Sequence, residues 1–428
     1  MNYIPKEIIS FIEENDVKFI RLTFTDLYGN LKNIAIMPCE LTRAFEYGIP
    51  FEAGFFSKHC SDLLLFPDIS TMSVLPWRPK SGRVIRFFCN IRHVDGTPYE
   101  GDMRSSLCSF IDKMRDNGYS CKVSTRCEFY LFNTDENGNP TKIPHDNASY
   151  LDIAPLDKCE NTRREICLSL EEMGFNPQTS RHSYGPGQNE IDFKRSNPIN
   201  AADNMVYYKT VVKNIASQNG LFASFMPKPM DNQLGSGLHI GISIKKDGKH
   251  IFSSDADKLT ATGKSFIAGI LNRINEITCF LNPTTNSYCR LNENVLNDNH
   301  GVLSDLFRLI RVPYSYGNEP CIEICSADAS CNPYIAFMLI LMAGLEGIEA
   351  DERLDKNLSE GGRIFKSDRI PRSFADAVSS AESSEFIKNA FEENVYSDIF
   401  RHLKGIIAGY NASDDKIKFE DEIWFRNI

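Results

Sequence analysis

The chain has 428 residues, which is too long for one ordinary hydrophobic core and predicts two or three domains, or a large domain with a smaller partner. Hydrophobic residues make up 42% and charged residues 24% of the chain, which is typical of soluble globular proteins. The formal net charge of -10 argues against nucleic acid or an anionic membrane as the main partner.

The first hundred residues have the pattern of a small β-rich unit. Residues 1–20 predict an amphipathic helix rather than the apolar core of a signal peptide. Within and after that stretch, residues 19–24 alternate as in a strand, and Tyr28-Gly29-Asn30 offers a turn before a second strand at 33–37. Residues 82–91 predict a further strand.

From Gly101 onward the pattern changes to helices that alternate with strands. Apolar residues recur three and four apart over 105–117 and 161–173, which predicts helices. The most apolar run, 335–345, is too short to span a bilayer and predicts a buried helix. Thirteen cysteines without paired CxxC spacing predict free thiols in a reducing cytoplasm.

Four predicted strands each carry one apolar face and one face that bears Glu or His. Side chains alternate across a strand, so the polar faces could line one shared cavity. The strands span 121–132, 189–194, 237–244 and 321–326, and their polar faces carry Glu128, Glu190, His239 and Glu323. Three carboxylates and an imidazole suit Mg²⁺, Mn²⁺ or Zn²⁺. The alternative is that these are the solvated faces of an antiparallel sheet, and the sequence alone leaves both open.

A long, ordered set of motifs resembles the type I glutamine synthetase family. The set runs from about residue 17 to 345 and is far more specific than any single short motif. It comprises Phe24-Thr25-Asp26 with Gly29 and Lys32, Ser61-Asp62, Phe66-Pro67-Asp68, Pro76-Trp77, Asp95 to Asp102, Gly185 to Phe193, Phe225-Met226-Pro227-Lys228-Pro229, Gly235 to His239, Asn282 to Tyr288 with Arg290-Leu291, and Asn332-Pro333-Tyr334.

The resemblance implies an α+β protein with two domains. Residues 1–100 would form an N-terminal β-grasp domain, and 101–428 a glutamine synthetase-type catalytic domain built on a curved antiparallel half-barrel with flanking helices. It also implies a homo-oligomer, usually a dodecamer of two hexameric rings with active sites between neighbouring subunits. Members of the family are ATP-dependent ligases. They phosphorylate glutamate with ATP, ammonia then displaces the phosphate, and Mg²⁺ or Mn²⁺ neutralises the charge of the phosphates.

The resemblance carries two metal positions over to this chain, each incomplete. Glu128 and Glu190 match two of three carboxylates around one metal, and Ser183 occupies the third position. His239 and Glu323 match two of three ligands of the other metal, and Arg126 stands where the family has Glu. An arginine keeps its proton and offers no lone pair to a metal, so it is expected to pair with Glu323 or Glu128 instead. The plainer interpretation of Arg126 is a structural buried salt bridge.

At the positions that bind substrate and phosphate in the family, some residues of this chain match the family and others differ. Matching positions are Gly235 and Arg290 for the substrate glutamate and Arg311 for the nucleotide, while Glu52 only approximates the Asp that takes a proton from ammonium. The departures are Cys321 and Cys325 in place of two arginines, Leu234 in place of Asn, a changed flap at 292–300, a shortened loop near 51–55, and no evident adenylylation tyrosine around 357–362.

Three functions are compatible with this mixture. The first is a pseudoenzyme that keeps the fold and binds a small molecule or a true synthetase. The second is a diverged ATP-dependent ligase that joins an acid to ammonia or an organic amine. The third is a different enzyme that uses one metal or a cysteine, with Cys321, Cys325 and His239 as zinc ligands, against the alternative that both cysteines only fill space.

Overall fold

The computed structural model describes residues 6–54, 62–78, 81–252, 259–292, 309–314, 319–355, 359–360, 364–365, 367 and 369–428. Its helices are α1 Lys6–Glu14, α2 Leu41–Tyr47, α3 Met103–Asp116, α4 Glu160–Glu172, α5 Pro198–Gln218, α6 Ala261–Leu281, α7 Thr285–Leu291, α8 Pro333–Glu349, α9 Phe374–Glu382, α10 Glu385–Ala390, α11 Glu393–Ala412 and α12 Lys416–Glu420. Its strands are β1 Val17–Thr25, β2 Leu31–Ile36, β3 Ile49–Glu52, β4 Asp62–Pro67, β5 Ser73–Val74, β6 Arg83–Arg92, β7 Tyr119–Thr134, β8 Pro140–Pro144, β9 Pro177–His182, β10 Gln188–Phe193, β11 Leu221–Ser224, β12 Leu238–Lys246, β13 Lys249–His250, β14 Ile310–Arg311, β15 Ile322–Ala327, β16 Ser359–Glu360 and β17 Ile364–Phe365.

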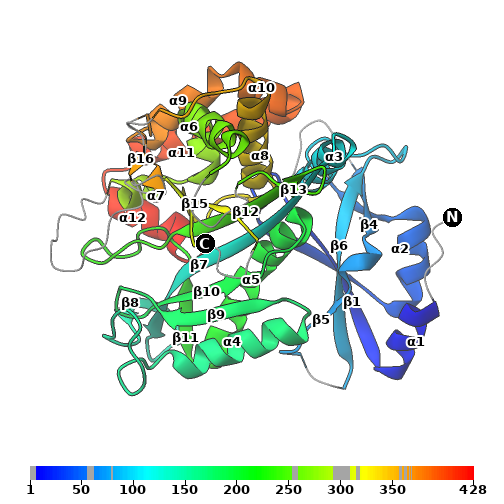
Figure 1. The fold of residues 1–428 in the computed structure, drawn as a ribbon. Coiled ribbons are helices and arrows are strands. Elements are labelled where there is room, and N and C mark those ends of the chain that lie inside the picture. Colours follow the sequence, from blue (N-terminus) through cyan, green and yellow to red (C-terminus); the bar gives the residue numbers. More distant parts are fainter. Residues whose placement is uncertain are drawn as a thin grey trace.

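The N-terminal unit is a β-grasp domain, drawn in blue in Figure 1. Its strands follow the order β2-β1-β6-β4-β3, and β5 pairs with β6. Strands β1 and β6 run parallel, whereas β2 pairs antiparallel with β1. Helices α1 and α2 place their buried apolar residues in one core with the inner faces of β1 and β6. A sheet that buries one face under helices needs strands in which apolar and polar residues alternate.

The amphipathic helix predicted over residues 1–20 is shorter in the structure. Helix α1 ends at Glu14, and Val17 already pairs with Arg83 of β6. Asp16 between them has a φ of 49°, in the left-handed region, so it breaks the helix and lets the chain turn into β1. Sheet pairing overrides the helical pattern from Val17 onward; residues 1–5 lie outside the described part.

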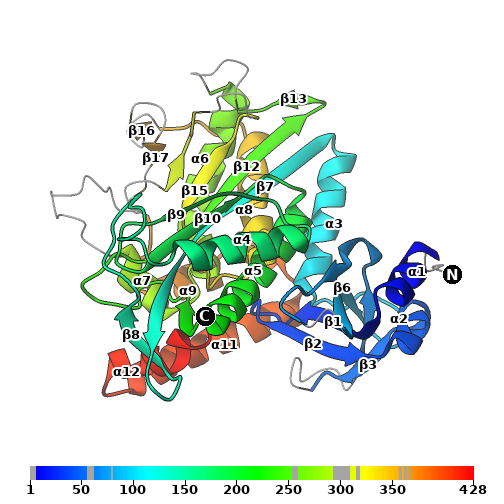
Figure 2. The same ribbon diagram turned by 90° about the horizontal axis from the view of Figure 1, so that it is seen from below.

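The larger unit is built on an eleven-stranded sheet that curls into a half-barrel. Its main path is β16-β17-β14-β15-β12-β7-β10-β9, with β11 and β8 paired to β7 and β13 paired to β12. Helices pack on one face of this sheet, and α6 and α8 lie side by side in both views (Figures 1 and 2). Gly269 of α6 allows that approach, because a Cβ there would lie 2.3 Å from the carbonyl oxygen of Ala343 on α8.

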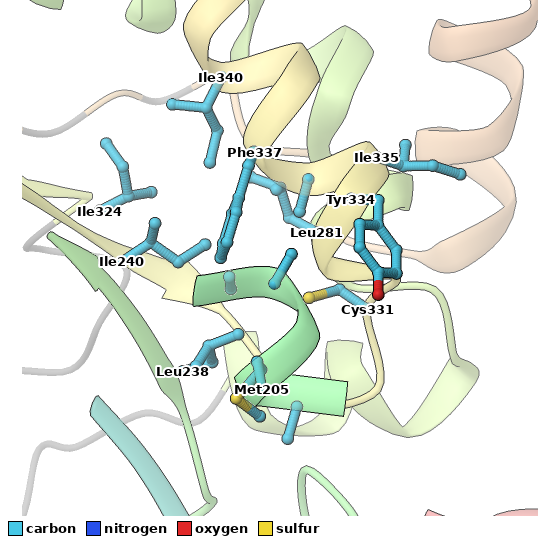
Figure 3. Close-up of a cluster of buried hydrophobic side chains, with 14 of the residues drawn as sticks. Met205, Leu238, Ile240, Leu281, Ile324, Cys331, Tyr334, Ile335, Phe337 and Ile340 are labelled. Carbon is cyan, nitrogen blue, oxygen red and sulfur yellow. The ribbon is translucent and has the colours of Figure 1, made fainter. Parts of the chain in front are cut away.

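The covered face of the sheet holds the main core. Figure 3 shows Leu238 and Ile240 of β12, Ile324 of β15 and Met205 of α5 gathered around Phe337 of α8. All are buried, so the apolar faces predicted for these strands lie against helices. The opposite faces of the same strands therefore carry the polar residues.

The helix boundaries follow from local chemistry. Asn197 caps α5 by accepting the Ile199 N–H at 2.9 Å, and Pro198 occupies the first helical position, where no N–H is needed. Helix α8 repeats this arrangement, and the predicted helices at 105–117, 161–173 and 335–345 are confirmed as α3, α4 and α8. None of the described helices combines the length and apolar character of a membrane span.

A buried arginine joins the two units. The Arg104 guanidinium, only 4% exposed, donates to Asp203 at 2.9 Å, to Asp68 at 2.8 Å and to Asn90 at 2.8 Å. Asp68 and Asn90 belong to the N-terminal unit, whereas Asp203 lies on α5. The joint is thus a fully bonded charge network, in which removing one partner leaves a buried charge without compensation.

Candidate functional site

Four adjacent strands bring the predicted polar residues together. Glu128 on β7 lies directly opposite Glu190 on β10, and on its other side β7 pairs Arg126 with His239 of β12. Strand β15 adds Glu323 opposite Gly241 of β12. The side chains of Glu190, Glu323 and His239 are only 10%, 13% and 18% exposed. These residues therefore lie together on one face of the sheet and are largely shielded from water.

Arg126 occupies the middle of one half of this cluster. Its Nη2 lies 2.5 Å from Nδ1 of His239 and 3.0 Å from Oε1 of Glu323. Because a guanidinium keeps its protons, Nδ1 of His239 is the acceptor in this contact. The lone pair that His239 would offer to a metal at this nitrogen is already engaged, and the expected pairing of Arg126 with Glu323 is formed.

Glu323 is enclosed by positive charge. Arg311 approaches Oε2 of Glu323 with Nε at 2.7 Å and Nη2 at 2.6 Å, on the side opposite the Arg126 contact. Burial alone would raise the pKa of Glu323, but the adjacent His239 ring and the charges of Arg126 and Arg311 outweigh burial and hold the pKa well below its usual value. Glu323 is therefore ionised and fully partnered.

The two cysteines do not form a pair. One ligand atom each from His239, Glu323 and Cys325 lie within 4.8 Å of one another. Cys321, by contrast, immediately precedes β15, and its sulfur accepts from Nη2 of Arg195 at 2.9 Å. The alternative of a zinc site that joins both cysteines with His239 is thus not assembled among the described residues.

The other half of the cluster is centred on Glu128. Ser183 donates to Oε1 of Glu128 at 2.6 Å, and the Gly237 N–H donates to Oε2 at 2.9 Å. Burial, followed by the nearby charge of Glu190, raises the pKa of Glu128 to about 7, although both hydrogen bonds act in the opposite direction. Glu128 therefore changes protonation near neutral pH.

Arg181 is a site residue that the sequence reasoning missed. It lies on β9 directly opposite Glu190 of β10, and its Nη2 forms ion pairs with Glu190 and, at 3.2 Å, with Asp192. A signal was present, because Arg181 stands two residues before Ser183 and so shares its face of the strand. Each half of the cluster thus contains an arginine bonded to a candidate metal ligand.

Arg290 and Gly235 lie in close contact. Nη2 of Arg290 donates to Oδ1 of Asn282 at 3.0 Å and to the carbonyl oxygens of Ser326 and Ala327 at 2.6 and 3.2 Å. A Cβ at position 235 would lie 2.5 Å from Cγ of Arg290, so only glycine fits there. The neighbouring Leu234 contributes its carbonyl oxygen, which accepts from the Tyr130 hydroxyl at 2.5 Å.

Glu52 is not part of this cluster. It ends β3 in the N-terminal sheet, where it is exposed and lies opposite Asp62 of β4. Most of the changed flap, at 293–300, and Phe55 of the shortened loop lie outside the described residues, as does most of the segment 357–362, where no adenylylation tyrosine is evident. Twelve described cysteines are free thiols, as predicted; Cys60 also lies outside.

A second buried group has a similar composition at another place. Ligand atoms of Asp146, Asp157 and Cys159 also lie within 4.8 Å of one another. Asp146 accepts from the Gly187 N–H at 2.8 Å and from Nε2 of His182 at 3.0 Å, and Asp157 forms a two-point ion pair with Arg163. These bonds fix the turn that leads into β10 and Glu190.

The residues present do not fit a Mg²⁺ or Mn²⁺ ion at the His239 and Glu323 position. Mg²⁺ demands six closely placed ligands, mostly oxygen, in octahedral geometry. Both oxygens of Glu323 are already bonded to guanidinium groups, which would repel a second cation. At the other position Arg181 pairs with Glu190, which leaves Glu128 as a carboxylate whose hydrogen bonds, within the described part of the chain, come only from Ser183 and Gly237.

Comparisons with known proteins agree with this fold along the whole chain. The family model described as "Glutamine synthetase, catalytic domain" matches residues 100–415, and "Glutamine synthetase, beta-Grasp domain" matches 16–94. The glutamine synthetase of Clostridium saccharobutylicum is 39% identical over 99% of this chain and 97% of its own. That of Methanosarcina mazei is 40% identical over 92% of this chain and 91% of its own.

This chain belongs to the glutamine synthetase family. Solved structures share its fold: Plasmodium falciparum glutamine synthetase has a TM-score of 0.82 at 21% identity and covers 99% of both chains. A complex of GmaS with ADP has a TM-score of 0.81 at 24% identity, covering 96% of this chain and 98% of the other. The resemblance read from the motifs is confirmed, as are the β-grasp domain and the half-barrel. Glutamine synthetases generally use ATP and divalent metal.

Proposed function

We propose that this glutamine synthetase family member is impaired in glutamine synthesis, or has lost it, and acts as a binding or regulatory homologue. One observation carries the proposal. The guanidinium of Arg126 lies between His239 and Glu323, where the family resemblance puts a metal ion. A guanidinium supplies positive charge but has no open coordination position for a phosphate oxygen.

The loss of cations elsewhere supports the same proposal. Phosphoryl transfer depends on positive groups that neutralise charge developing on the transferred phosphate, and one such arginine is worth roughly a thousandfold or more in rate. Cys321 and Cys325 stand where the family has two arginines, and Arg311 is bonded to Glu323. Glu52, exposed on β3, would have to serve the ammonium site of a neighbouring subunit.

The proposal retains the assembly of the family. We propose a cytoplasmic homo-oligomer, a dodecamer of two hexameric rings, in which the 1–100 and 101–428 domains of neighbouring subunits meet. Gly235 and Arg290 would then be free of the catalytic cycle and could hold a small carboxylate ligand. Glu128, Glu190, His239 and Glu323 would act as a charge network in place of a metal centre.

A second candidate is a diverged ATP-dependent ligase that joins a carboxylate to ammonia or an organic amine. It is favoured by two features that a purely structural protein does not need. Arg290 packs against Gly235 at the position that the resemblance gives to the substrate, and Glu128 has a pKa of about 7, which suits a general base. In this case the chemistry would rest on Glu128, Glu190, His239, Glu323, Arg290 and Arg311 with MgATP or MnATP.

Calorimetric titration with ATP, with and without Mg²⁺ or Mn²⁺, separates the two candidates. We expect no metal-dependent binding at millimolar ATP. Metal-dependent binding, followed by release of ADP with any acid and amine, would contradict the first candidate and support the second.

The variant Arg126→Glu directly tests whether the Arg126 guanidinium takes the place of a metal ion. It replaces the guanidinium with a second carboxylate, which would be the third ligand beside His239 and Glu323, so we expect Mn²⁺ affinity to rise at least a hundredfold. Arg115→Glu, a change at a 70% exposed arginine, is the matched control for charge and should leave Mn²⁺ affinity unchanged. Equal Mn²⁺ binding by wild type and Arg126→Glu would show that Arg126 does not replace the ion.

A further inference from the structure

A cavity of 190 Å³ lies between the two domains and shares no residue with the carboxylate cluster. The N-terminal domain contributes residues of β1, of β2 and of the segment that follows β5, and the larger domain contributes α5 (Figure 2). On α5 the lining residues recur three and four positions apart, at Tyr207, Thr210 and Asn214, so they share one face of the helix. A molecule bound in this cavity would therefore contact both domains.

Two guanidinium groups line this cavity without an acidic neighbour. Arg21 comes from β1 and Arg78 from the segment after β5, and none of the described lining residues is an aspartate or a glutamate. Arg21 donates to Oδ1 of Asn33 at 2.7 Å, which orients the guanidinium but leaves its charge without compensation. Within the described part of the chain neither arginine forms an ion pair, whereas Arg126 and Arg181 in the carboxylate cluster do. The cavity therefore attracts negative charge.

Tyr207 brings a further positive field and a hydroxyl group to the same cavity. The buried guanidinium of Arg86 lies over the Tyr207 ring, with Cζ 4.5 Å from the ring centroid, and it donates to the uncharged carbonyl oxygen of Thr71. Burial raises the pKa of Tyr207. The charges of Arg86, Arg21 and Arg78 act in the opposite direction, so the fields of all three meet at its hydroxyl. Tyr207 is only 4% exposed, and among the described residues its hydroxyl has no hydrogen-bond partner.

The rest of the lining sets the size and the body of a ligand. The rings of Trp77 and Tyr207 stack with centroids 6.2 Å apart and an interplanar angle of 26°, and Leu31 and Leu75 add aliphatic surface. A cavity of about 150 Å³ binds benzene, so 190 Å³ has room for roughly six to ten non-hydrogen atoms. A fitting ligand is therefore small and has a short apolar part between or beside its charged groups.

We propose that this interdomain cavity binds a small organic dianion, either a dicarboxylate or a phosphate monoester. The guanidinium groups of Arg21 and Arg78 match the oxygens of both kinds of anion, and the Tyr207 hydroxyl donates one more hydrogen bond. Tyr207 also lies about one helical turn after Asp203, which holds Arg104 at the joint between the domains. A bound dianion thus adds a second link between the N-terminal sheet and α5.

Calorimetric titration of the full chain tests the requirement for two negative charges. The probes are succinate and glycerol 3-phosphate as dianions, propionate as a monoanion and succinamide as a neutral molecule of the same shape as succinate. We expect saturable binding of at least one dianion, at least tenfold weaker binding of propionate, and no binding of succinamide. The dianion that binds more tightly shows whether the natural ligand is a dicarboxylate or a phosphate monoester.

Substitution of Arg78 separates this cavity from other cationic groups, including Arg290. Arg78 is exposed and makes no hydrogen bond within the described residues, so Arg78→Gln should leave the unfolding of the ligand-free protein in urea unchanged. We expect the affinity for the dianion to fall at least tenfold in Arg78→Gln and in Tyr207→Phe. Arg43→Gln, at a 57% exposed arginine of the same domain, is the matched control and should bind as wild type does.

Fluorescence of Trp77 provides a second, local readout. The chain has two tryptophans, so Trp77 is the sole indole in a Trp424→Phe variant. We expect its emission to change saturably with the same dianion, at the midpoint found by calorimetry, and to ignore succinamide. The proposal is overturned if neither dianion binds saturably, if binding survives Arg78→Gln, if Arg43→Gln loses as much affinity, or if Trp77 emission stays constant while the dianion binds.

Discussion

Two buried groups in this protein have the composition of a metal site, yet they are closed in different ways. Asp146, Asp157 and Cys159 are satisfied by backbone N–H groups, His182 and Arg163, so each carboxylate serves to hold a turn. His239 and Glu323 are instead bonded to Arg126 and Arg311 on the open face of the sheet. Composition and proximity alone do not define a metal centre. Whether a group of ligand atoms can bind a metal depends on whether other residues already occupy the lone pairs of those atoms.

The largest loss of stability is expected from a change in the group formed by Asp146, Asp157 and Cys159. In Asp157→Ala, Arg163, which is 6% exposed, keeps only its hydrogen bond to Asn189 among the residues that the structure describes, and it becomes a buried charge without a counter-ion there. We expect the free energy of unfolding to fall by about 3–5 kcal/mol in urea titrations. Asp112→Ala, which breaks an exposed pair with Arg115, is the control and should cost at most about 1 kcal/mol. Equal losses would mean that the Asp146–Asp157–Cys159 group is not a structural anchor.

The pH dependence of the free energy of unfolding tests Glu128, which belongs to the same carboxylate cluster as His239 and Glu323. Because the pKa of Glu128 is raised to about 7 in the folded state, its contribution to stability is fully present below its unfolded pKa and is lost as pH rises to about 7. Wild type should therefore lose about 1–3 kcal/mol relative to Glu128→Gln between roughly pH 4.5 and 7. The measurement is urea unfolding of both proteins across this range. A constant difference would show that Glu128 titrates normally.

Removal of Arg126 is expected to cost less than the loss of Asp157. In Arg126→Met the carboxylate of Glu323 keeps both bonds to Arg311, and the methionine fills much of the vacated volume. We expect a loss of about 1–2 kcal/mol, since no charge is left buried alone. Thermal and urea unfolding beside Arg163→Met give the comparison. A loss as large as that of Arg163→Met would make Arg126 chiefly a structural residue.

The smallest effect is expected from Ser183. Ser183→Ala removes the 2.6 Å hydrogen bond to Glu128 and leaves its bond to the Gly237 N–H. Loss of a bond that favours the ionised form should raise the pKa of Glu128 further and cost about 1 kcal/mol at neutral pH. The same pH series, repeated with this variant, should shift its midpoint upward. An unchanged midpoint would mean that Ser183 does not tune the carboxyl group.

Strand alternation predicted which residues lie on the polar faces of the strands, but it left open whether those faces meet in one cavity. The apolar residues of β7, β10, β12 and β15 had to face helices, so Glu128, Glu190, His239 and Glu323 had to share the other face. The same reasoning expected Arg126 to pair with Glu323 or Glu128, because an arginine beside carboxylates forms ion pairs with them, and Glu323 is the partner in the structure. The motifs supplied the order of the strands, which periodicity alone could not provide.

The predictions from sequence that failed also have physical causes. Arg181 escaped notice because the short β9 carries Gln178, Thr179 and Ser180, which give no apolar alternation that would mark a strand. Cys321 was assigned to a strand face, but β15 begins only at Ile322, so its sulfur turns to Arg195. The helix expected over residues 1–20 ended early because pairing between β1 and β6 outweighed local periodicity.

The joint at Arg104 also sets an order of events during synthesis. Asp68 and Asn90 leave the ribosome before Arg104, but Asp203 follows 99 residues later. At about 5–20 residues per second, translation needs roughly 5–20 seconds to deliver that second carboxylate. Until then the N-terminal sheet can form, but its arginine partner remains only half neutralised and open to water. A pause in translation between α3 and α5 would prolong this state, so the nascent chain is most exposed to misassembly there.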